Sequence, residues 1–456
     1  MGVVTGQGAG AENLADALVG AYNTSGLLEQ NRALLRAADE DVAGALARLR
    51  PVIDWTTEYT RSIARTASFN GFSFTTRTIH GSTFTTGLTL SWLVYDGGAS
   101  RLGVQSTKET VLATRQSLLD IEQQILLRAV AAYMNVLLQG ENVSLRINNV
   151  RVLGEELRAA QDRFDVGEVT RTDVALAESR LAASRSSLAD ARGGLANARA
   201  EYTNAVGHAP GTLAGQPALP APSASAQAAE VMARRLHPAV LAAQHSVAAA
   251  ELTVLQASKS LGPTARIVAQ VGVSDSLRDE SFTDSASATL RLTQPLYAGG
   301  TIASGLRRAK AARDGQRSNL LNVQRNVVQD ANDAYVRLQV SRASLVATNE
   351  RVRAAGVAFD GIREEATLGA RTTLDVLTAE QELLNAQTAR ISDQAELSIA
   401  SFELLARQGL LTAERLHLGV QIYDPTIYYN LVKDAPAYKS RQSRALDRVF
   451  EAMGKR

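Results

Sequence analysis

The chain of 456 residues contains no cysteine. This absence excludes structural disulfides, thiolate metal sites, a cysteine nucleophile and lipidation of an N-terminal cysteine. Aromatic residues make up only 5% of the chain, which is little material for large globular cores and favours long packed helices. The formal net charge is only +2, so the charge balance gives no sign of a nucleic-acid partner.

Long apolar runs are missing as well. No stretch of 18 or more apolar residues occurs, so no transmembrane helix is predicted. The first residues, MGVVTGQGAGAENL, lack the basic and hydrophobic pattern of a signal peptide. We therefore expect either a cytosolic protein or a chain from which a signal peptide has been removed.

Proline is absent from two long stretches of the sequence. All ten prolines lie outside residues 52–209 and 296–424. Proline in a helix interior costs about 3 kcal/mol, so these two stretches can form long helices. Four of the ten prolines fall in residues 208–228, which we interpret as a linker between two halves of the chain.

A short motif occurs twice, as LVYDGGA at residues 93–99 and PLYAGGT at residues 295–301. Tyr95 and Tyr297 are 202 positions apart, and the same offset relates Gly97 and Gly98 to Gly299 and Gly300. Without a gap, it also relates Gly167 to Gly369, Asp173 to Asp375, Glu178 to Glu380, Leu181 to Leu383 and Gly207 to Gly409. A repeat of this length predicts one structural unit used twice.

Hydrophobic residues recur every seven positions within each half. The first half contains the series Leu112, Leu119, Leu126, Tyr133, the neighbouring series Val111, Leu118, Ile125, and a later series Val174, Leu181, Leu188, Leu195, Tyr202. Such spacing predicts coiled-coil-like helix packing. We expect long helices at about 99–166, 172–206, 300–366 and 373–408, with Gly140 as the one candidate for a break. The segments 165–174 and 366–376 then form tight turns between antiparallel helices.

Segments before the repeated motif alternate between apolar and polar residues. LTLSWLVY (88–95) and TARIVAQVGV (264–273) show this period of two, which predicts strands. We expect hairpins at about 51–96 and 263–298, with strands of about ten residues and polar tips at 70–83 and 274–286. The first hairpin holds both tryptophans and many other aromatic residues, which fits sheet packing or, better, an aromatic girdle at a membrane interface.

Four such strands are long enough to cross an outer membrane but cannot close a barrel. Because open sheet edges are not tolerated in lipid, several copies of the chain would have to build one barrel together. The long helices would continue from its rim as a bundle.

With these elements and motifs, the chain resembles the TolC-like family of outer-membrane efflux and secretion channels. The motifs that carry the resemblance are YDGG and YAGG, RFDVGEVTRTDV from Arg163, LGARTTLDVLTAEQELLNAQ from Leu368, and YDPTIYY at 423–429. The resemblance covers about residues 12–435. It implies a mostly α-helical fold with membrane β-strands: a homotrimer with a twelve-stranded outer-membrane barrel and a periplasmic helical tunnel.

The resemblance also implies the domain organisation and the partners. Residues 1–207 and 229–424 would be two structural repeats joined by the linker 208–228, and residues 425–456 a periplasmic tail. The partners would be a periplasmic membrane-fusion adaptor, an inner-membrane transporter and outer-membrane lipid, with no cofactor and no metal. The expected function is that of a passive exit duct for a tripartite efflux pump or a type I secretion system of a Gram-negative bacterium.

The gate of this family lies at the periplasmic end, where charge pairs and a ring of acidic side chains close the tunnel. By resemblance the pair is Asp173 with Arg371 and the ring residue is Asp375. At two positions the chain departs from the family pattern: Ala366 replaces a latching tyrosine, and Thr378 replaces a second acidic residue. In the alternative interpretation Asp173 and Asp375 simply cap helices and Arg371 is a surface residue.

Two further groups of residues receive roles from the resemblance. The helix tips that would contact the adaptor contain Val166, Gly167, Val169, Leu368 and Gly369; the alternative is that they are mobile exposed turns. The junctions from barrel to helix would be Tyr95, Gly97 and Gly98, and Tyr297, Gly299 and Gly300, where glycine permits a backbone turn with positive φ.

Catalysis has little support in the sequence. The five histidines are scattered, and no nucleophile elbow, phosphate loop or zinc pattern occurs. We therefore expect that the protein is not an enzyme. The alternative function, a soluble periplasmic coiled-coil adaptor or scaffold, would explain the heptads but not the alternating hairpins.

Overall fold

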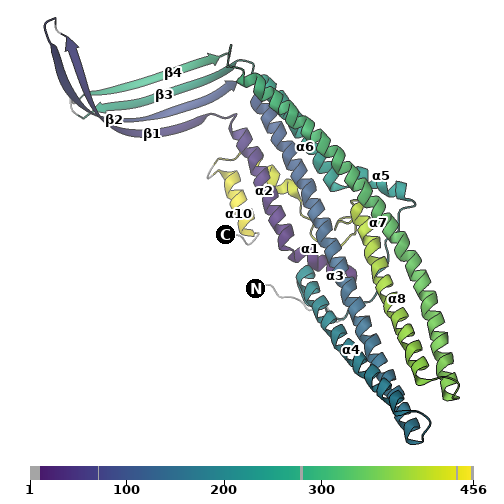
Figure 1. Ribbon diagram of the computed structural model, residues 1–456. Helices are drawn as coiled ribbons and strands as arrows, with labels where there is room; N and C mark the ends of the chain where they lie inside the picture. The colour runs from purple at the N-terminus through teal and green to yellow at the C-terminus, as the bar shows by residue number, and fades with distance from the viewer. Residues whose placement is uncertain (1–10, 70, 278–280, 438–439, 453–456) are drawn as a thin grey trace. The chain divides into compact units, whose positions relative to one another are not determined.

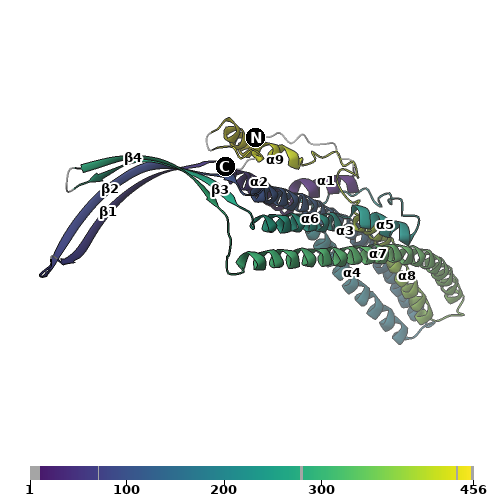
Figure 2. The same cartoon turned by 90° about the horizontal axis from the view of Figure 1, so that it is seen from above.

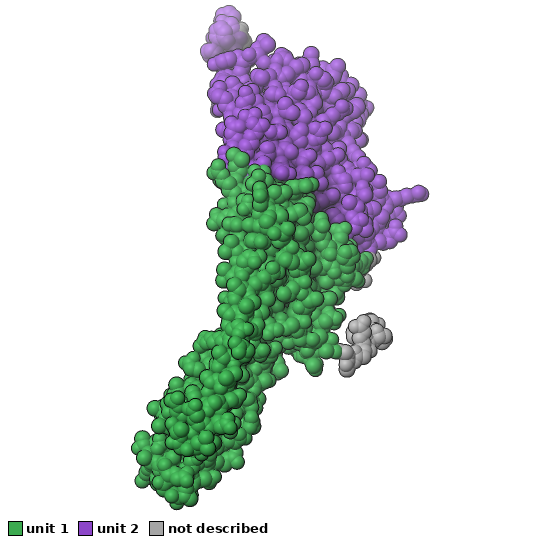
Figure 3. Space-filling view, turned by 90° about the vertical axis from the view of Figure 1, so that its right-hand side faces the viewer, with its two compact units in different colours: residues 1–33, 116–242, 321–423 green, residues 34–115, 243–320, 424–456 purple. Residues whose placement is uncertain are grey.

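The computed structural model describes residues 11–69, 71–277, 281–437 and 440–452. The chain is mostly helical and falls into two compact units (Figure 3). Unit 1 comprises Met1–Ala33, Gln116–Ala242 and Leu321–Tyr423, and unit 2 comprises Leu34–Arg115, Ala243–Leu320 and Asp424–Arg456. Each unit therefore takes segments from both halves of the sequence.

Two β-hairpins interrupt a succession of helices along the chain (Figure 1). In order they are α1 (Leu14–Thr24), α2 (Gly26–Ala47), β1 (Val52–Phe69), β2 (Phe74–Tyr95), α3 (Ala99–Asp165), α4 (Arg171–Val206), α5 (Ala226–Leu236), α6 (Pro238–Lys259), β3 (Thr264–Ser276), β4 (Ser281–Thr293), α7 (Thr301–Thr367), α8 (Thr373–Arg407), α9 (Pro425–Val432) and α10 (Arg441–Ala452). No helix in these described ranges is both long and apolar enough to cross a membrane.

Unit 2 contains one antiparallel sheet with the strand order β1-β2-β3-β4. Its strands have 18, 22, 13 and 13 residues, so the expected length of about ten was too short. Residues 74–83 belong to β2 rather than to a polar tip, because β1 and β2 pair as far as Phe69 opposite Phe74. This stretch is rich in threonine, whose branched side chain favours strands although it adds no apolar alternation.

The same correction applies to the second hairpin, where residues 281–286 lie in β4. Figure 2 shows the β1–β2 hairpin reaching beyond the β3–β4 hairpin, as their lengths require. Every residue of β1 and of β4 is exposed in the single chain. The aromatic residues of the first hairpin share this exposure, Trp55 being 73% and Phe74 75% accessible. They therefore form no core beneath the sheet.

The longest helices are α3 and α7, with 67 residues each. Helix α3 continues through Gly140 without the break that the sequence allowed. In unit 1, parts of α3, α4, α7 and α8 pack together at two apolar clusters. One contains Leu153, Leu181 and Leu377, and the other is built on Phe359, Ala366, Val376 and Ala379.

Small residues form much of the buried face of α4. The predicted positions Val174, Leu188 and Leu195 are only half-buried. Leu181 and Tyr202 of the predicted series are buried, and so is a second series at the same spacing of seven: Ala177, Ser184, Ala191, Ala198 and Ala205. Small side chains allow neighbouring helices to approach closely.

Helix α3 buries members of both predicted heptad series. Within unit 1, Leu126 and Tyr133 of the first series and Leu118 and Ile125 of the neighbouring series are buried, whereas Leu119 is 37% exposed. Both series therefore contribute to the core along this part of α3.

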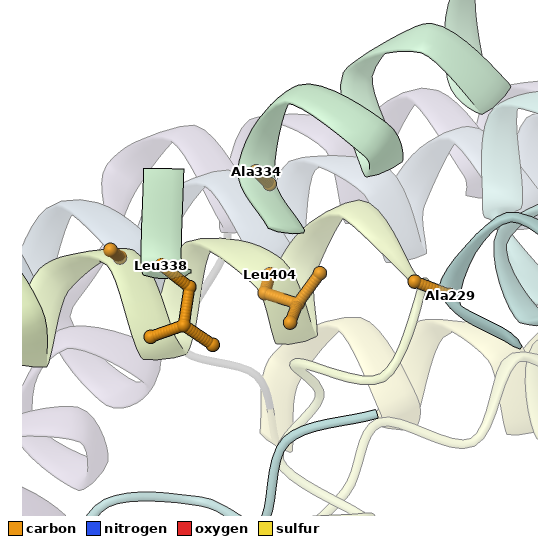
Figure 4. Packing of buried hydrophobic residues seen from close by; sticks show 5 residues of the cluster. Ala229, Ala334, Leu338 and Leu404 are labelled. Carbon is orange, nitrogen blue, oxygen red and sulfur yellow. The ribbon is translucent and has the colours of Figure 1, made fainter. Parts of the chain in front are cut away.

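A further core cluster of unit 1 joins α5, α7 and α8 (Figure 4). It consists of Ala229, Ala334, Leu338, Ala400 and Leu404, with Tyr335 and Leu397 partly buried against it. In unit 2, the C-terminal helices pack on α2, since Tyr428, Val432 and Leu446 form a cluster with Ala43. The segment expected to be a periplasmic tail is therefore helical and attached where it is described.

Candidate gate and contact tips

Two tight turns in unit 1 carry the residues assigned to the gate. Tip 1 (residues 166–170) joins α3 to α4, and tip 2 (residues 368–372) joins α7 to α8. Gly167 and Gly369 have φ values of 81° and 78°, which favour glycine. In each tip the residue after the glycine donates its N–H back across the helix end, Glu168 to Arg163 O and Ala370 to Glu365 O, both at 2.9 Å. Both helices thus end in a Schellman motif.

Asp173 and Asp375 belong to identical capping boxes. Thr170 and Thr372 are the N-cap residues of α4 and α8. The hydroxyl of Thr170 donates to Oδ2 of Asp173 at 2.7 Å, and that of Thr372 donates to Oδ2 of Asp375 at 2.9 Å. In return, the N–H groups of both aspartates donate to the threonine hydroxyls at 3.3 and 3.2 Å. The helix-capping interpretation of these residues is therefore confirmed.

The caps also hold both carboxyl groups in their ionised form. Hydrogen bonds from the Thr170 hydroxyl and backbone N–H lower the pKa of Asp173. Those from the Thr372 backbone N–H and hydroxyl lower the pKa of Asp375. All these bonds are accepted by Oδ2. Because both pKa values are lowered, each aspartate keeps its negative charge at the start of its helix.

Arg371 of tip 2 forms an ion pair with a residue at the end of α7. Its Nε lies 2.7 Å from Oε2 of Glu365, with both side chains about half exposed. The Glu365 carboxylate raises the pKa of Arg371. Arg371 is therefore more than an unpartnered surface residue, while its predicted pairing with Asp173 stays a prediction.

The two positions that depart from the family pattern have ordinary local roles. Ala366, at the position where the resemblance would place a latching tyrosine, is buried in the apolar cluster between α7 and α8. Thr378 is exposed one turn after Asp375 and donates its hydroxyl to Leu374 O at 2.8 Å.

The tips expose apolar side chains. Leu368 is 81% and Val166 71% exposed, while Val169 is half-buried. The contacts within unit 1 thus leave an accessible apolar residue on each tip.

The two junctions in unit 2 make the same glycine turn, but the strands before them end at different positions relative to that turn. Gly97, Gly98, Gly299 and Gly300 have φ values of 65°, 87°, 59° and 84°. Tyr95 is the last residue of β2, but Tyr297 lies four residues after β4 ends at Thr293. The second hairpin, expected to extend to about residue 298, therefore ends earlier, and Pro295 supplies a reason, because proline cannot donate to the ladder.

The first junction has a side-chain cap that the second lacks. The Asp96 carboxylate accepts from the N–H groups of Gly98 at 3.0 Å and Ser100 at 2.7 Å. The corresponding residue 202 positions later is Ala298, which has no acceptor in its side chain.

One set of residues in unit 1 has no counterpart among the sequence predictions. Asn149, Ser184 and Glu380 are all at least 92% buried and connect α3, α4 and α8 by hydrogen bonds. The sequence repeat relates Glu380 to Glu178, which is exposed. The repeat therefore gave no sign of the buried network. Among the described residues, no group of three or more potential metal ligands occurs.

Comparison with known proteins gives a consistent result. The family model described as outer membrane efflux protein matches residues 21–208 and 231–409. The outer membrane efflux protein BepC of Brucella suis is 35% identical over 434 residues, which cover 95% of this chain and 93% of BepC. The outer membrane protein TolC of Escherichia coli is 24% identical, covering 89% and 84% of the two chains.

Two further comparisons concern secretion and fold. The alkaline protease secretion protein AprF of Pseudomonas aeruginosa is 26% identical, covering 65% of this chain and 62% of AprF. The solved CmeC outer membrane channel of Campylobacter jejuni superimposes with a TM-score of 0.76 at 16% identity, covering 93% of this chain and 90% of CmeC. This last similarity shows the fold.

Proposed function

This chain belongs to the outer membrane efflux protein family, and from that premise we propose that three copies form one gated tunnel. The protein is an outer-membrane exit channel of the efflux and secretion type. The alternative of a soluble periplasmic adaptor or scaffold is not favoured by these relatives. That its relatives are named as efflux, secretion and outer membrane proteins supports our proposal of a passive duct without catalytic activity.

One observation carries the proposal of a trimer. The sheet has four strands, and its edges are β1 and β4, both exposed along their whole length. Exposed edges must be paired in a bilayer. Two copies would give eight strands, whose interior is just filled by side chains, whereas three copies give twelve strands and room for a lumen.

The repeated order of hairpin, 67-residue helix and shorter helix supports a duplicated unit. On this proposal the repeats are residues 1–207 and 229–424, the linker is 208–228 and the tail is 425–456. Each chain then enters the helical tunnel twice from the barrel, through the glycine pairs at 97–98 and 299–300.

The gate is proposed at the capped ends of α4 and α8. Three copies of Asp375 would form an acidic ring, and the Thr372 hydrogen bonds that lower the pKa of Asp375 in each copy favour its charged form. Like charges repel one another and attract cations. Arg371 would exchange its partner Glu365 for Asp173 when the gate closes.

The exposed residues Val166 and Leu368, with Gly167, Val169 and Gly369, would contact a periplasmic adaptor that links the channel to an inner-membrane transporter. The relatives named for efflux and for alkaline protease secretion support both kinds of system. The transporter would determine which substrate is exported.

Ion selectivity tests the gate assignment. In planar bilayers, the reversal potential in a salt gradient should show cation preference for the unmodified trimer and a smaller preference for Asp375→Asn. Conversely, Thr378→Asp should strengthen the cation preference by adding a second ring one turn along α8.

Asp165→Asn is the matched control. Asp165 is an exposed aspartate at the end of α3, directly before tip 1. This substitution should leave selectivity unchanged. Equal selectivity in the wild type, Asp375→Asn and Thr378→Asp channels would contradict the gate assignment.

A further inference from the structure

Three polar side chains from three helices meet in the interior of unit 1. Asn149 of α3 donates its Nδ2 to Oε1 of Glu380 on α8 at 2.8 Å. Ser184 of α4 donates its hydroxyl to Oδ1 of Asn149. Their exposed fractions are 8%, 6% and 5% for Asn149, Glu380 and Ser184. The network therefore ties the α7–α8 hairpin to the α3–α4 hairpin.

The network lies close to the proposed gate. Glu380 follows the cap residue Thr372 by eight positions, which corresponds to about 12 Å along the helix. The apolar cluster of Leu153, Leu181 and Leu377 lies three or four residues nearer the tips on the same three helices. Separation of the two hairpins at the tips would have to disrupt both layers.

The site is built for a neutral carboxyl group. Oε2 of Glu380 is buried and has no hydrogen-bond partner among the described residues. A cavity of about 60 Å³ lies beside it and is lined by Arg146, Arg180 and Gln381, among others. An ionised carboxylate in such a position is expensive, whereas the protonated form is not.

Charged groups face Glu380 from each neighbouring helix. Arg146 and Glu156 lie on α3, Arg180 on α4 and Arg363 on α7. Arg363 is paired with Glu156 at 3.3 Å, so part of its charge is already compensated. Burial raises the pKa of Glu380 to about 7; the hydrogen bond from Asn149 opposes this shift, Glu156 adds to it and Arg363 opposes it.

We propose that Asn149, Ser184 and Glu380 form a proton-linked latch that holds the two hairpins together when Glu380 is protonated and releases them when it ionises. The proposal rests on the gated trimer proposed above. On this proposal the gate responds to pH through Glu380, an interior residue away from the acidic ring.

The sign of the response follows from the packing. When the hairpins separate, water reaches Glu380 and its pKa falls toward the ordinary value of 4.5. The latch therefore stabilises the closed arrangement fully below about pH 4.5, and this stabilisation is lost as the pH rises through about 7. Asp375 lies outside this network, and the hydrogen bonds from Thr372 lower its pKa rather than raise it.

The test compares channel opening at pH 5 and pH 8 in planar bilayers. The ratio of open to closed wild-type channels should rise at least about tenfold over this interval, with roughly seventyfold per copy as the limit for a pKa of 4.5 in the open state and about 7 in the closed state. Glu380→Gln carries a neutral amide that can still accept from Asn149. It should stay closed at both pH values and lose the pH response.

Two further variants make the result specific. Glu178→Gln alters the exposed glutamate at the equivalent position of the repeat and should keep the wild-type response. Asn149→Asp places a second carboxyl group beside Glu380 and should move the midpoint of the response to higher pH by about one unit or more.

The outcomes separate the latch from the gate. If Glu380→Gln keeps the wild-type pH response, or the wild type shows none, the latch is refuted while the acidic ring and its selectivity can still stand. If the reconstituted wild type forms no channels, the proposed function fails and the latch fails with it.

Discussion

Asp173 and Asp375 perform the same local task at the starts of α4 and α8. Each accepts a hydrogen bond from the N-cap threonine and returns one through its N–H. The pattern Thr-x-x-Asp after a glycine turn is visible in the sequence at both positions, so the caps could be predicted. Whether a cap also lines a pore depends on neighbouring copies, which local sequence does not encode.

Removing a cap should loosen the start of its helix. Thr170→Ala deletes both hydrogen bonds of the Thr170 hydroxyl, at a cost of about 1 kcal/mol. The amides of Asp173 and Val174 should then exchange hydrogen about fivefold faster. Ser186→Ala, an exposed site within α4, is the control and should leave these two amides unchanged. Equal exchange in Thr170→Ala and the wild type would show that the cap has no energetic role.

Glu178 and Glu380 show where inference from a repeat stops. They occupy equivalent positions in the sequence, yet one is exposed and the other is 6% accessible. The difference arises from the partners, because Asn149 and Ser184 approach only Glu380 through helices that are distant in sequence. Such a three-helix contact has no local signal.

At the scale of elements, the long stretches without proline predicted the structure better than the local alternation of apolar and polar residues did. The stretches without proline contain α3, α4, α7 and α8, because proline is the residue that a helix interior excludes most strongly. Strand lengths were underestimated, since threonine-rich segments such as 75–86 form regular strands without the apolar alternation by which strands were recognised. A heptad pattern of large side chains does not reveal the buried small residues of α4, because alanine and serine are as common on exposed helix faces.

Glycines at helix ends differ in what they permit. Gly369 and Gly409 both have positive φ, at 78° and 77°. A Cβ added to Gly409 would lie 2.6 Å from Leu236 O and 2.8 Å from His237 Cα, whereas no described atom lies within 4 Å of one added to Gly369. Backbone atoms cannot move aside as a flexible side chain can, so the end of α8 needs glycine for two reasons.

Alanine at these two positions should separate the two effects. Gly369→Ala should cost about 1–2 kcal/mol for the left-handed conformation alone. Gly409→Ala should cost about 1–3 kcal/mol more, because it also overpacks the contact with Leu236 and His237. Thermal melting of the detergent-solubilised protein, followed by circular dichroism, would reveal the order. Equal melting temperatures of the two variants would mean that the backbone around Leu236 moves aside without a loss of stability.

At the scale of the whole molecule, the open sheet edges require an assembly. Within one chain, β1 and β4 are separated by β2 and β3. Three strand spacings of about 4.8 Å place them about 14 Å apart, and a disulfide needs Cα atoms within about 7 Å. A disulfide between β1 and β4 can therefore form only between different copies, and the absence of native cysteines makes engineered pairs unambiguous.

Cysteine pairs with one member on β1 and the other on β4 should therefore form disulfides between copies when the copies close into a ring. Thr57→Cys on β1 is combined in turn with cysteine at Ser285, Ala286, Ser287, Ala288 or Thr289 on β4. In a Gram-negative outer membrane, oxidation should give dimer and trimer bands, and reactive positions should alternate along β4 because only side chains on the same face meet.

Thr57→Cys combined with Gln270→Cys is the matched control, since β3 is paired on both sides by β2 and β4 and should never reach β1 of another copy. Crosslinking of this control as strongly as the edge pairs would indicate random collision. Bands that extend beyond the trimer would indicate an open chain of subunits and would contradict closure by three copies. Since each chain supplies one β1 edge and one β4 edge, a closed ring of three leaves none of the six edges unpaired.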